Sequence, residues 1–272
     1  KQCGNCPLLP GGGSKSDLSA SVWKKKKQML ERYSILFVAC SKWLANKAKK
    51  SGLLVGQKVM DIPNTIDTRV FGKEDREQAR IYANLPGDKR LILFVSQRVT
   101  DKRKGMDYFI AALNKMTEAH PEIKDNTAVA ILGGHSEELA NKLSLPAYPL
   151  GYVDDAKKIA SIYNSVDMFV LPSLEDNLPN TIMEAMACGV PCVGFNTGGI
   201  PEMIDHQKNG YVAEYKSVED LSNGMYWVMC ADHASLSREA IKKVNSCYSQ
   251  YAVAMKYIEA YNQAMAFKRY KL

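Results

Sequence analysis

The chain has 272 residues, 46% of them hydrophobic and 24% charged, a composition that allows one large domain or two smaller ones with a buried core. A net charge of +7 at pH 7 favours an anionic ligand or surface. The sequence has no apolar run long enough to cross a bilayer and no secretory signal. Its seven cysteines, an odd number, favour reduced thiols, so we expect a cytoplasmic protein.

The first thirty or so residues are expected to be irregular, because they contain three consecutive glycines (Gly11–Gly13) and a run of four lysines (Lys24–Lys27). Cys3 and Cys6 have the spacing of half a zinc site, but no second cysteine pair matches that spacing. The four histidines are scattered as well, so the sequence predicts no metal site.

Two short strands are predicted next, at residues 35–39 and 59–62, with a helix that Ser41 caps between them. Residues 72–88 are expected to form a polar connector with a helical piece. A strand, a helix and another strand are too few elements to bury a core of their own.

After residue 90 the pattern becomes regular, with apolar runs alternating with amphipathic segments. Such alternation predicts parallel strands joined by right-handed helical crossovers, so the expected fold class is α/β with a Rossmann-like, doubly wound parallel sheet. The strands are predicted at 91–95, 128–132, 148–150, 168–171 and 192–195, and the helices at 106–116, 137–143, 156–164, 181–188 and through most of 217–268.

Three predicted loops leave the carboxyl ends of these strands and should line one crevice. The loop at residues 96–105 carries Arg98 and Lys104 just before a helix begins, which suits a diphosphate. A solvated basic turn is the alternative. The loop at 196–202 contains two glycines that would let its backbone approach a ligand, or that simply form a tight turn.

The remaining loop follows the strand at 168–171 and carries two acids, Asp176 and Glu184, eight residues apart. Their carboxylates could accept hydrogen bonds from sugar hydroxyls. The alternatives are an Asx-turn at Asp176 and a capping box, Thr181-x-x-Glu184, in which Glu184 serves only the helix end. No Gly-x-Gly-x-x-Gly follows a strand, so dinucleotide binding is not expected.

At these residues the chain resembles retaining glycosyltransferases of the GT4 family, which have the GT-B fold, from about residue 38 to the C-terminus. Several motifs carry the resemblance in one order: Pro63–Asp67 with Phe71 as the interdomain linker, Arg98 and Lys104 as the basic pair, Gly151–Asp154 with Tyr163 as the nucleobase segment, and Asp176 to Pro191 as the Glu-x7-Glu motif and its continuation. The Cys3–Pro7 and Asp17–Ser19 stretches resemble a bacterial subgroup that builds surface polysaccharides.

The resemblance implies a role for each matching residue. The basic pair would stabilise the leaving diphosphate without a metal or cofactor, Glu184 would bind the ribose, and Asp176 with the following amides would hold the donor sugar. The catalytic residues expected on this basis are Arg98, Lys104 and Asp176, and the substrate-binding residues are Glu184, Gly134, Tyr152, Val153, Asn177, Leu178, Pro179, Asn180 and Thr181.

Two departures from the family pattern concern the acidic loop. The first acid is an aspartate, one methylene shorter than glutamate, and Glu175 beside it could compete for the role, although register favours Asp176. Pro179 stands in a segment whose amides should contact the sugar, and a proline has no N–H to offer.

The resemblance also implies a domain order. Residues 1–70 would be a remnant of an acceptor-binding domain with the linker, 71–250 the nucleotide-sugar-binding domain, and 251–272 a C-terminal helix. Roughly 100 residues that would complete the acceptor domain are lacking, judged from typical domain sizes, so we expect this chain alone to be a poor catalyst.

The implied function is transfer of a sugar from a UDP-, GDP- or ADP-sugar to a sugar or lipid-linked acceptor, with retained configuration, in polysaccharide or glycolipid synthesis. A sugar-nucleotide epimerase and a binding module without turnover are the alternatives. Trp23 beside Lys24–Lys27 could touch an anionic membrane surface at the inner face, or could belong to a solvated basic segment. No nucleic-acid partner is expected.

Overall fold

The computed structural model describes residues 3–98 and 101–266, which divide into two compact units. The smaller unit contains the chain up to Pro63 and from Val253 onward, and the larger unit comprises Asn64–Ala252. Among the described residues, no helix combines the length and the apolar character needed to pass through a bilayer.

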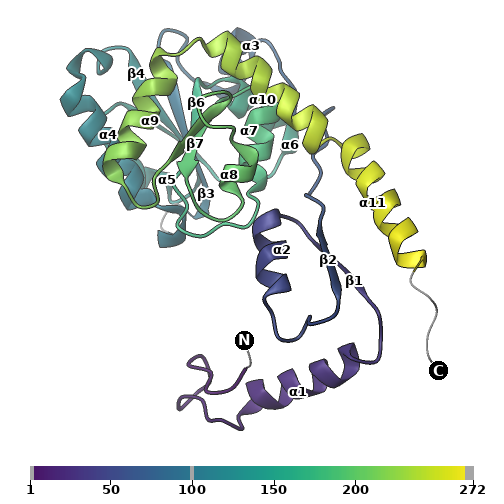
Figure 1. Cartoon of the computed structure of the whole chain (residues 1–272). Coiled ribbons are helices and arrows are strands. Elements are labelled where there is room, and N and C mark those ends of the chain that lie inside the picture. Colours follow the sequence, from purple (N-terminus) through teal and green to yellow (C-terminus); the bar gives the residue numbers. More distant parts are fainter. Residues whose placement is uncertain (1–2, 99–100, 267–272) are drawn as a thin grey trace. The chain divides into compact units, whose positions relative to one another are not determined.

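The larger unit is built on a six-stranded parallel sheet with the strand order β5-β4-β3-β6-β7-β8 (Figure 1). This arrangement confirms the predicted α/β class and parallel sheet. The strands are β3 (Arg90–Arg98), β4 (Thr127–Gly134), β5 (Ala147–Gly151), β6 (Met168–Leu171), β7 (Cys192–Phe195) and β8 (Gly210–Ala213). The last of these was not predicted, because its four residues include a glycine and are too few to show a periodic pattern.

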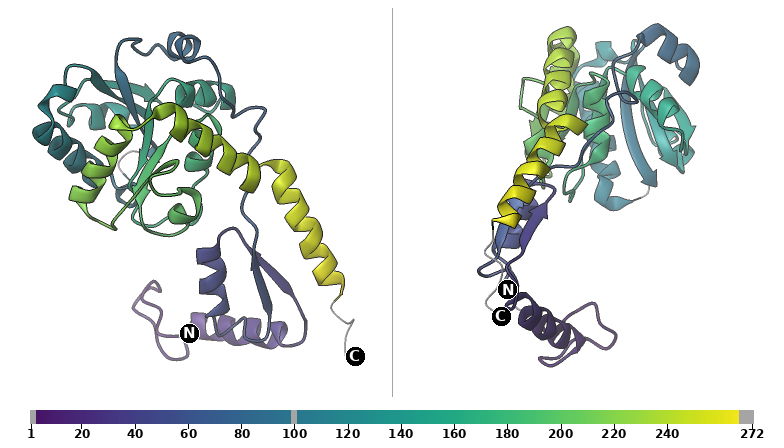
Figure 2. Two further views of the ribbon diagram at one scale, coloured as in Figure 1. Left: turned by 45° about the horizontal axis from the view of Figure 1, so that its top comes forward. Right: turned by 90° about the vertical axis from the view of Figure 1, so that its right-hand side faces the viewer.

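Helices cover both faces of this sheet, as the two views in Figure 2 show. Each face has its own apolar core. On one face lie α4 (Met106–Ala119), α5 (Ser136–Ala140) and α9 (Val218–Cys230). On the other lie α3 (Arg76–Ala83), α6 (Ala156–Asn164), α7 (Asn180–Ala187), α8 (Ile200–Met203) and α10 (His233–Cys247). Short 3-10 turns occupy Lys102–Lys104 and Pro121–Ile123.

The central strands are buried on both faces, as their continuous apolar sequences require. In β3, the four residues from Leu91 to Phe94 are at most 1% exposed. Their side chains alternate between the two cores, so Leu91 and Leu93 join one cluster while Ile92 and Phe94 join the other.

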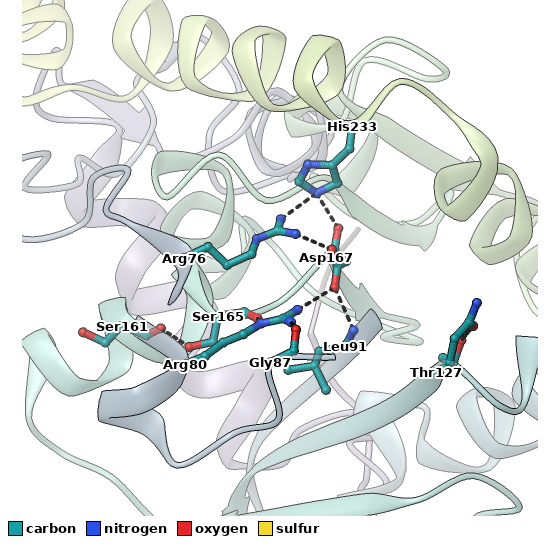
Figure 3. A network of polar contacts seen from close by, with 10 residues as sticks. Arg76, Arg80, Gly87, Leu91, Thr127, Ser161, Ser165, Asp167 and His233 are labelled. Carbon is teal, nitrogen blue, oxygen red and sulfur yellow. Dashed lines mark hydrogen bonds and ion pairs between the residues drawn. The ribbon is translucent and has the colours of Figure 1, made fainter. Parts of the chain in front are cut away.

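Asp167, just before β6, holds together the edge of the sheet at which the strands begin (Figure 3). Its Oδ1 accepts a hydrogen bond from Nη1 of Arg76 at 2.6 Å, and its Oδ2 accepts from Nη2 of Arg80 at 3.1 Å and from the backbone N–H of Leu91 at 2.8 Å. Its carbonyl oxygen lies 2.9 Å from Nε2 of His233. One residue therefore joins α3, β3 and α10.

Arg80 is buried together with its charge, since its side chain is only 8% exposed. Burial lowers the pKa of Arg80, and the carboxylate of Asp167 opposes that shift. The remaining donors of the guanidinium are satisfied by carbonyl oxygens, Nε by Ser165 at 2.9 Å and Nη1 by Gly87 at 2.8 Å. Such a charge is tolerated inside a protein because each of the three guanidinium nitrogens donates a hydrogen bond and a carboxylate lies beside them.

The smaller unit contains a parallel pair of strands, β1 (Leu36–Ala39) and β2 (Lys58–Asp61), with the predicted helix α2 (Lys42–Lys49) between them in sequence. Ser41 caps α2 as predicted, because its hydroxyl accepts from the N–H of Leu44 at 3.0 Å. Most of α11 (Gln250–Met265) also belongs to this unit. Residues 267–268, where helix was predicted to continue, lie outside the described residues.

The expectation that the first thirty residues are irregular was wrong for Leu18–Leu30, which forms helix α1. Asp17 begins this helix by accepting a hydrogen bond from the N–H of Ala20 at 3.0 Å. Lysine has a high helix propensity, so a lysine run after an aspartate cap extends a helix.

We predict that Asp167→Ala lowers the free energy of unfolding by about 3 kcal/mol or more, because it leaves the buried guanidinium of Arg80 unpaired. Urea unfolding followed by circular dichroism measures the change. Asp125→Ala is the control, since Asp125 is an exposed acid just before β4 and has no part in the Arg80 network. Equal stability of the two variants would contradict this account of Asp167.

Candidate functional site

The loops after β3, β6 and β7 lie at one edge of the sheet and contact one another through their backbones. Near the same edge, a side chain on Gly133 in β4 would put its Cβ 1.7 Å from the carbonyl oxygen of Ser96 in β3. A Cβ on Gly105, after β3, would lie 1.9 Å from the carbonyl oxygen of Pro172 after β6. Both glycines also have positive φ angles, 140° at Gly133 and 75° at Gly105. Each position therefore requires glycine for two reasons: a Cβ would clash, and other residues rarely adopt such a φ angle.

The loop after β7 approaches the acidic loop in the same way. A Cβ on Gly198 would lie 1.6 Å from the carbonyl oxygen of Asp176, and one on Gly199 would lie 2.0 Å from that of Asn177. The N–H of Gly199 donates to the carbonyl of Asp176 at 3.3 Å. The two glycines predicted in this loop therefore bring it against the acidic loop of the protein itself.

Lys104 and Asp176 form an ion pair between the loops after β3 and β6, with Nζ 2.7 Å from Oδ2. The hydroxyl of Ser173, which is fully buried, also donates to Oδ2 at 3.3 Å. The two charged side chains are only 25% and 17% exposed, whereas Glu175 is exposed. The carboxylate at position 176 is thus the one that faces the basic loop, and it bonds to side chains rather than forming the Asx-turn considered from the sequence.

Glu184 lies in α7, and its Oε2 accepts a hydrogen bond from the hydroxyl of Tyr163 in α6 at 3.0 Å. Burial raises the pKa of Glu184, and the bond from Tyr163 partly offsets that shift. The capping-box interpretation was wrong, because α7 begins at Asn180 with Pro179 as its N-cap. Thr181 is therefore inside the helix, and its buried hydroxyl has no hydrogen-bond partner among the described residues.

The predicted basic and nucleobase residues lie along β3, β4 and β5. Arg98 pairs in register with Gly134, so the two loops leave the sheet side by side. Among the residues that the structure describes, Arg98 forms no ion pair. Residues 99 and 100 of the predicted basic loop lie outside those residues. After β5, Tyr152 is 65% exposed, and Val153 packs against the core.

The residues from Asn177 to Asn180 connect the acidic loop to α7. Leu178 is buried at 6% exposure and anchors the segment in the core, while Asn180 is exposed. The side-chain oxygen of Asn180 lies 3.4 Å from Nδ2 of Asn64, in the predicted linker. The backbone N–H of Ile66 donates to the carbonyl of Tyr248 at 3.0 Å, which fastens this linker to the end of α10.

Sequence reasoning missed three features of this region: the hydroxyl of Ser173 on Asp176, the hydroxyl of Tyr163 on Glu184, and the contact of Asn64 with Asn180. A serine three residues before an acid is a local signal that could have indicated the first. The other two join residues that only the fold brings together. Within residues 3–98 and 101–266, no three histidine, cysteine or acidic side chains cluster as metal ligands would.

Residues 89–230, slightly more than half of the chain, match the family described as "Glycosyl transferases group 1". The curated relatives are distant. D-inositol 3-phosphate glycosyltransferase 1 of Catenulispora acidiphila is 26% identical over 66% of this chain and 47% of its own length. An uncharacterized glycosyltransferase of Methanocaldococcus jannaschii is 29% identical over 71% of this chain and 50% of its own length. The chain spans about half the length of these relatives.

Solved structures share the fold at low sequence identity. Sucrose-phosphate synthase from Thermosynechococcus elongatus superposes with a TM-score of 0.72 and 21% identity, over 92% of this chain and 62% of the other. Anabaena HepE, in complex with UDP and glucose, superposes with a TM-score of 0.67 and 17% identity, over 88% of this chain and 66% of the other.

We predict that Gly198→Ala destabilises the protein by about 2 kcal/mol or more, because it combines a strained positive φ with a clash against the backbone of Asp176. Thermal unfolding of the two proteins measures the loss. Gly87→Ala is the control, because a Cβ at that position meets no atom within 4 Å. The close approach of the two loops would be refuted if Gly198→Ala were as stable as the control.

Proposed function

The chain belongs to the glycosyl transferases group 1 family, and from this premise we propose that its larger unit binds a nucleotide-sugar donor. The whole protein would transfer the sugar to an acceptor hydroxyl with retained configuration, as GT4 enzymes do, in polysaccharide or glycolipid synthesis. The observation that carries the proposal is the ion pair of Lys104 with Asp176, because it joins a basic and an acidic loop, 72 residues apart, at one edge of the sheet.

The proposed chemistry follows from where negative charge develops. Cleavage of the donor leaves charge on the nucleoside diphosphate, and cations already in place stabilise that charge without reorganisation. Lys104 is held by Asp176. Arg98 is the last residue of β3, the strand that leads into the loop carrying Lys104. We assign these two cations to the diphosphate and Asp176 to the sugar that is transferred.

The other predicted residues take the remaining parts of the donor. Glu184 would accept hydrogen bonds from the ribose. The backbone at Gly134 and the segment Tyr152–Val153 would contact the base. The turn Asn177–Asn180 and the buried hydroxyl of Thr181 would face the sugar and its phosphate. That hydroxyl has no hydrogen-bond partner in the described part of the chain, which supports this assignment because a ligand oxygen would satisfy it.

A binding module without turnover is the second candidate, and the specific observation that favours it is length. The chain spans about half the length of its curated relatives, and a donor-binding unit by itself would bind a nucleotide-sugar without transferring the sugar. Calorimetry with UDP-, GDP- and ADP-sugars, followed by turnover assays with an acceptor, separates the candidates. Release of an altered nucleotide-sugar without an acceptor would instead indicate an epimerase.

We predict that Lys104→Ala and Arg98→Ala each weaken binding of the preferred nucleotide-sugar about tenfold or more, since a hydrogen bond to a charged group contributes roughly 1.5–3 kcal/mol. Isothermal titration calorimetry measures the change. Lys115→Ala is the charge-matched control, because Lys115 pairs with Glu219 on helices α4 and α9. The diphosphate assignment is falsified if all three variants bind as the unaltered chain does.

A peripheral membrane contact at the inner face is the least direct part of the proposal, and helix α1 supports it. Leu18, Val22 and Met29 are spaced four and seven residues apart, so they share one face of the helix, and they are 67%, 39% and 54% exposed. Lys25 lies on the same face. Exposed apolar side chains beside a lysine run suit an anionic lipid surface.

Replacing Lys24–Lys27 by glutamine is expected to weaken binding to phosphatidylserine vesicles, measured by sedimentation, about a hundredfold or more, because each of the four lysines near such a surface contributes about 1 kcal/mol. The control replaces four lysines of the neighbouring helix and its end, Lys42, Lys47, Lys49 and Lys50, which are also exposed. Equal loss in both variants would mean that only net charge matters, and unchanged sedimentation would reject the contact.

A further inference from the structure

Tyr163 is the largest fully buried side chain of the larger unit, and its hydroxyl points to a carboxylate. The ring packs edge-on against Phe71, with centroids 6.5 Å apart, and against Phe169, with centroids 5.9 Å apart. These contacts fix the ring, so the hydroxyl is held 3.0 Å from Oε2 of Glu184. Phe71 comes from the segment that precedes α3, and Phe169 comes from β6.

We propose that Tyr163 is a positioning residue that orients the carboxylate of Glu184 toward the ribose hydroxyls of the donor nucleotide. This inference rests on the proposed function, because it takes the ribose contact of Glu184 from there. Tyr163 itself touches no ligand, since its side chain is fully buried.

The need for a tyrosine, rather than a phenylalanine, is the first argument. Phenylalanine would fill the space between Phe71 and Phe169 equally well and would bring no polar atom into the core. A buried hydroxyl must find a partner, and this one bonds to a side chain of the candidate site rather than to a nearby carbonyl. Packing alone therefore does not account for the hydroxyl.

The geometry at Glu184 is the second argument. The bond from Tyr163 occupies Oε2, and Oε1 has no hydrogen bond from any described residue. A carboxylate fixed through one oxygen presents the other in a defined direction, and it can accept bonds from one or both hydroxyls of a ribose. An unfixed glutamate would lose side-chain entropy when it bound the same ligand.

The charge of Glu184 is the third argument. Burial raises its pKa, and the hydroxyl of Tyr163 from α6 opposes that shift. The other titratable groups close to this pair are the thiols of Cys188 and Cys192, whose pKa values burial raises, so both are neutral. The bond from Tyr163 thus favours the ionised carboxylate. Without it the pKa of Glu184 rises further, so the charge is lost at a higher pH as the solution is acidified.

A cycle of two substitutions, one in the protein and one in the ligand, tests the inference. UDP and 2′,3′-dideoxy-UDP are titrated into the unaltered chain, Tyr163→Phe and Glu184→Gln, with the GDP or ADP pair if the protein prefers another base. We expect the unaltered chain to prefer the hydroxylated ligand about tenfold. In Tyr163→Phe that preference should shrink to threefold or less, with little change in affinity for the dideoxy ligand.

Tyr211→Phe is the matched control. Its hydroxyl also donates to a carboxylate, Oδ1 of Asp220 at 2.8 Å, but it belongs to β8 and packs with the opposite core. We expect this variant to keep the full preference for the hydroxylated ligand. Titration of the ¹³C-labelled Glu184 carboxyl by NMR adds a readout that needs no ligand, and we expect a higher pKa in Tyr163→Phe than in the control.

The outcomes separate the two proposals. If Glu184→Gln loses the ribose preference while Tyr163→Phe retains it, the positioning role is overturned and the proposed function survives. A full preference in Glu184→Gln refutes the ribose contact itself. If no nucleoside diphosphate binds the unaltered chain, the proposed function fails. The positioning role is overturned as well if the pKa of Glu184 is the same in Tyr163→Phe and the control.

Discussion

The backbone contacts between loops at the carboxyl edge of the sheet are the constraint on which the candidate site depends. Gly105, Gly198 and Gly199 let the loops after β3, β6 and β7 approach to distances at which any side chain would collide with a carbonyl group. Only this approach brings Lys104, on a loop after β3, within 2.7 Å of Asp176, on a loop after β6. Such close packing restricts the movement of these loops, which would hold the charged side chains in place before the proposed nucleotide-sugar binds.

The opposite edge of the sheet is held by different means. There Asp167 accepts hydrogen bonds from two arginines and from the backbone of β3. Removing one partner of a buried, hydrogen-bonded charge lowers the free energy of unfolding strongly, so this network contributes to the stability of the fold. A charged network therefore holds the amino ends of β3 and β6, and close backbone packing shapes the loops beyond the carboxyl ends of the strands.

Much of this fold could be predicted from the sequence because its signals are local. The bounds predicted for β6, β7 and α6 agree with the structure, since each is a short apolar or amphipathic segment between clear breaks. The helix at Leu18–Leu30 was not predicted, because the run of four lysines suggests an exposed, irregular segment. Lysine also has a high helix propensity, and here that propensity decides the structure. The strand β8 was missed because four residues owe their extended form to pairing with β7.

The candidate site shows the same division between local and non-local information. That the loops meet follows from parallel strands, but which side chains meet depends on how each loop folds. Register favoured Asp176 over Glu175, and the structure directs Asp176 to Lys104 while Glu175 is exposed. Nothing near Glu184 in sequence indicates Tyr163, which lies 21 residues earlier and reaches Glu184 only because α6 packs beside α7. A capping box was a reasonable local interpretation of Thr181 and Glu184. It failed because Pro179 starts the helix earlier, which frees the carboxylate of Glu184 for a partner on another helix.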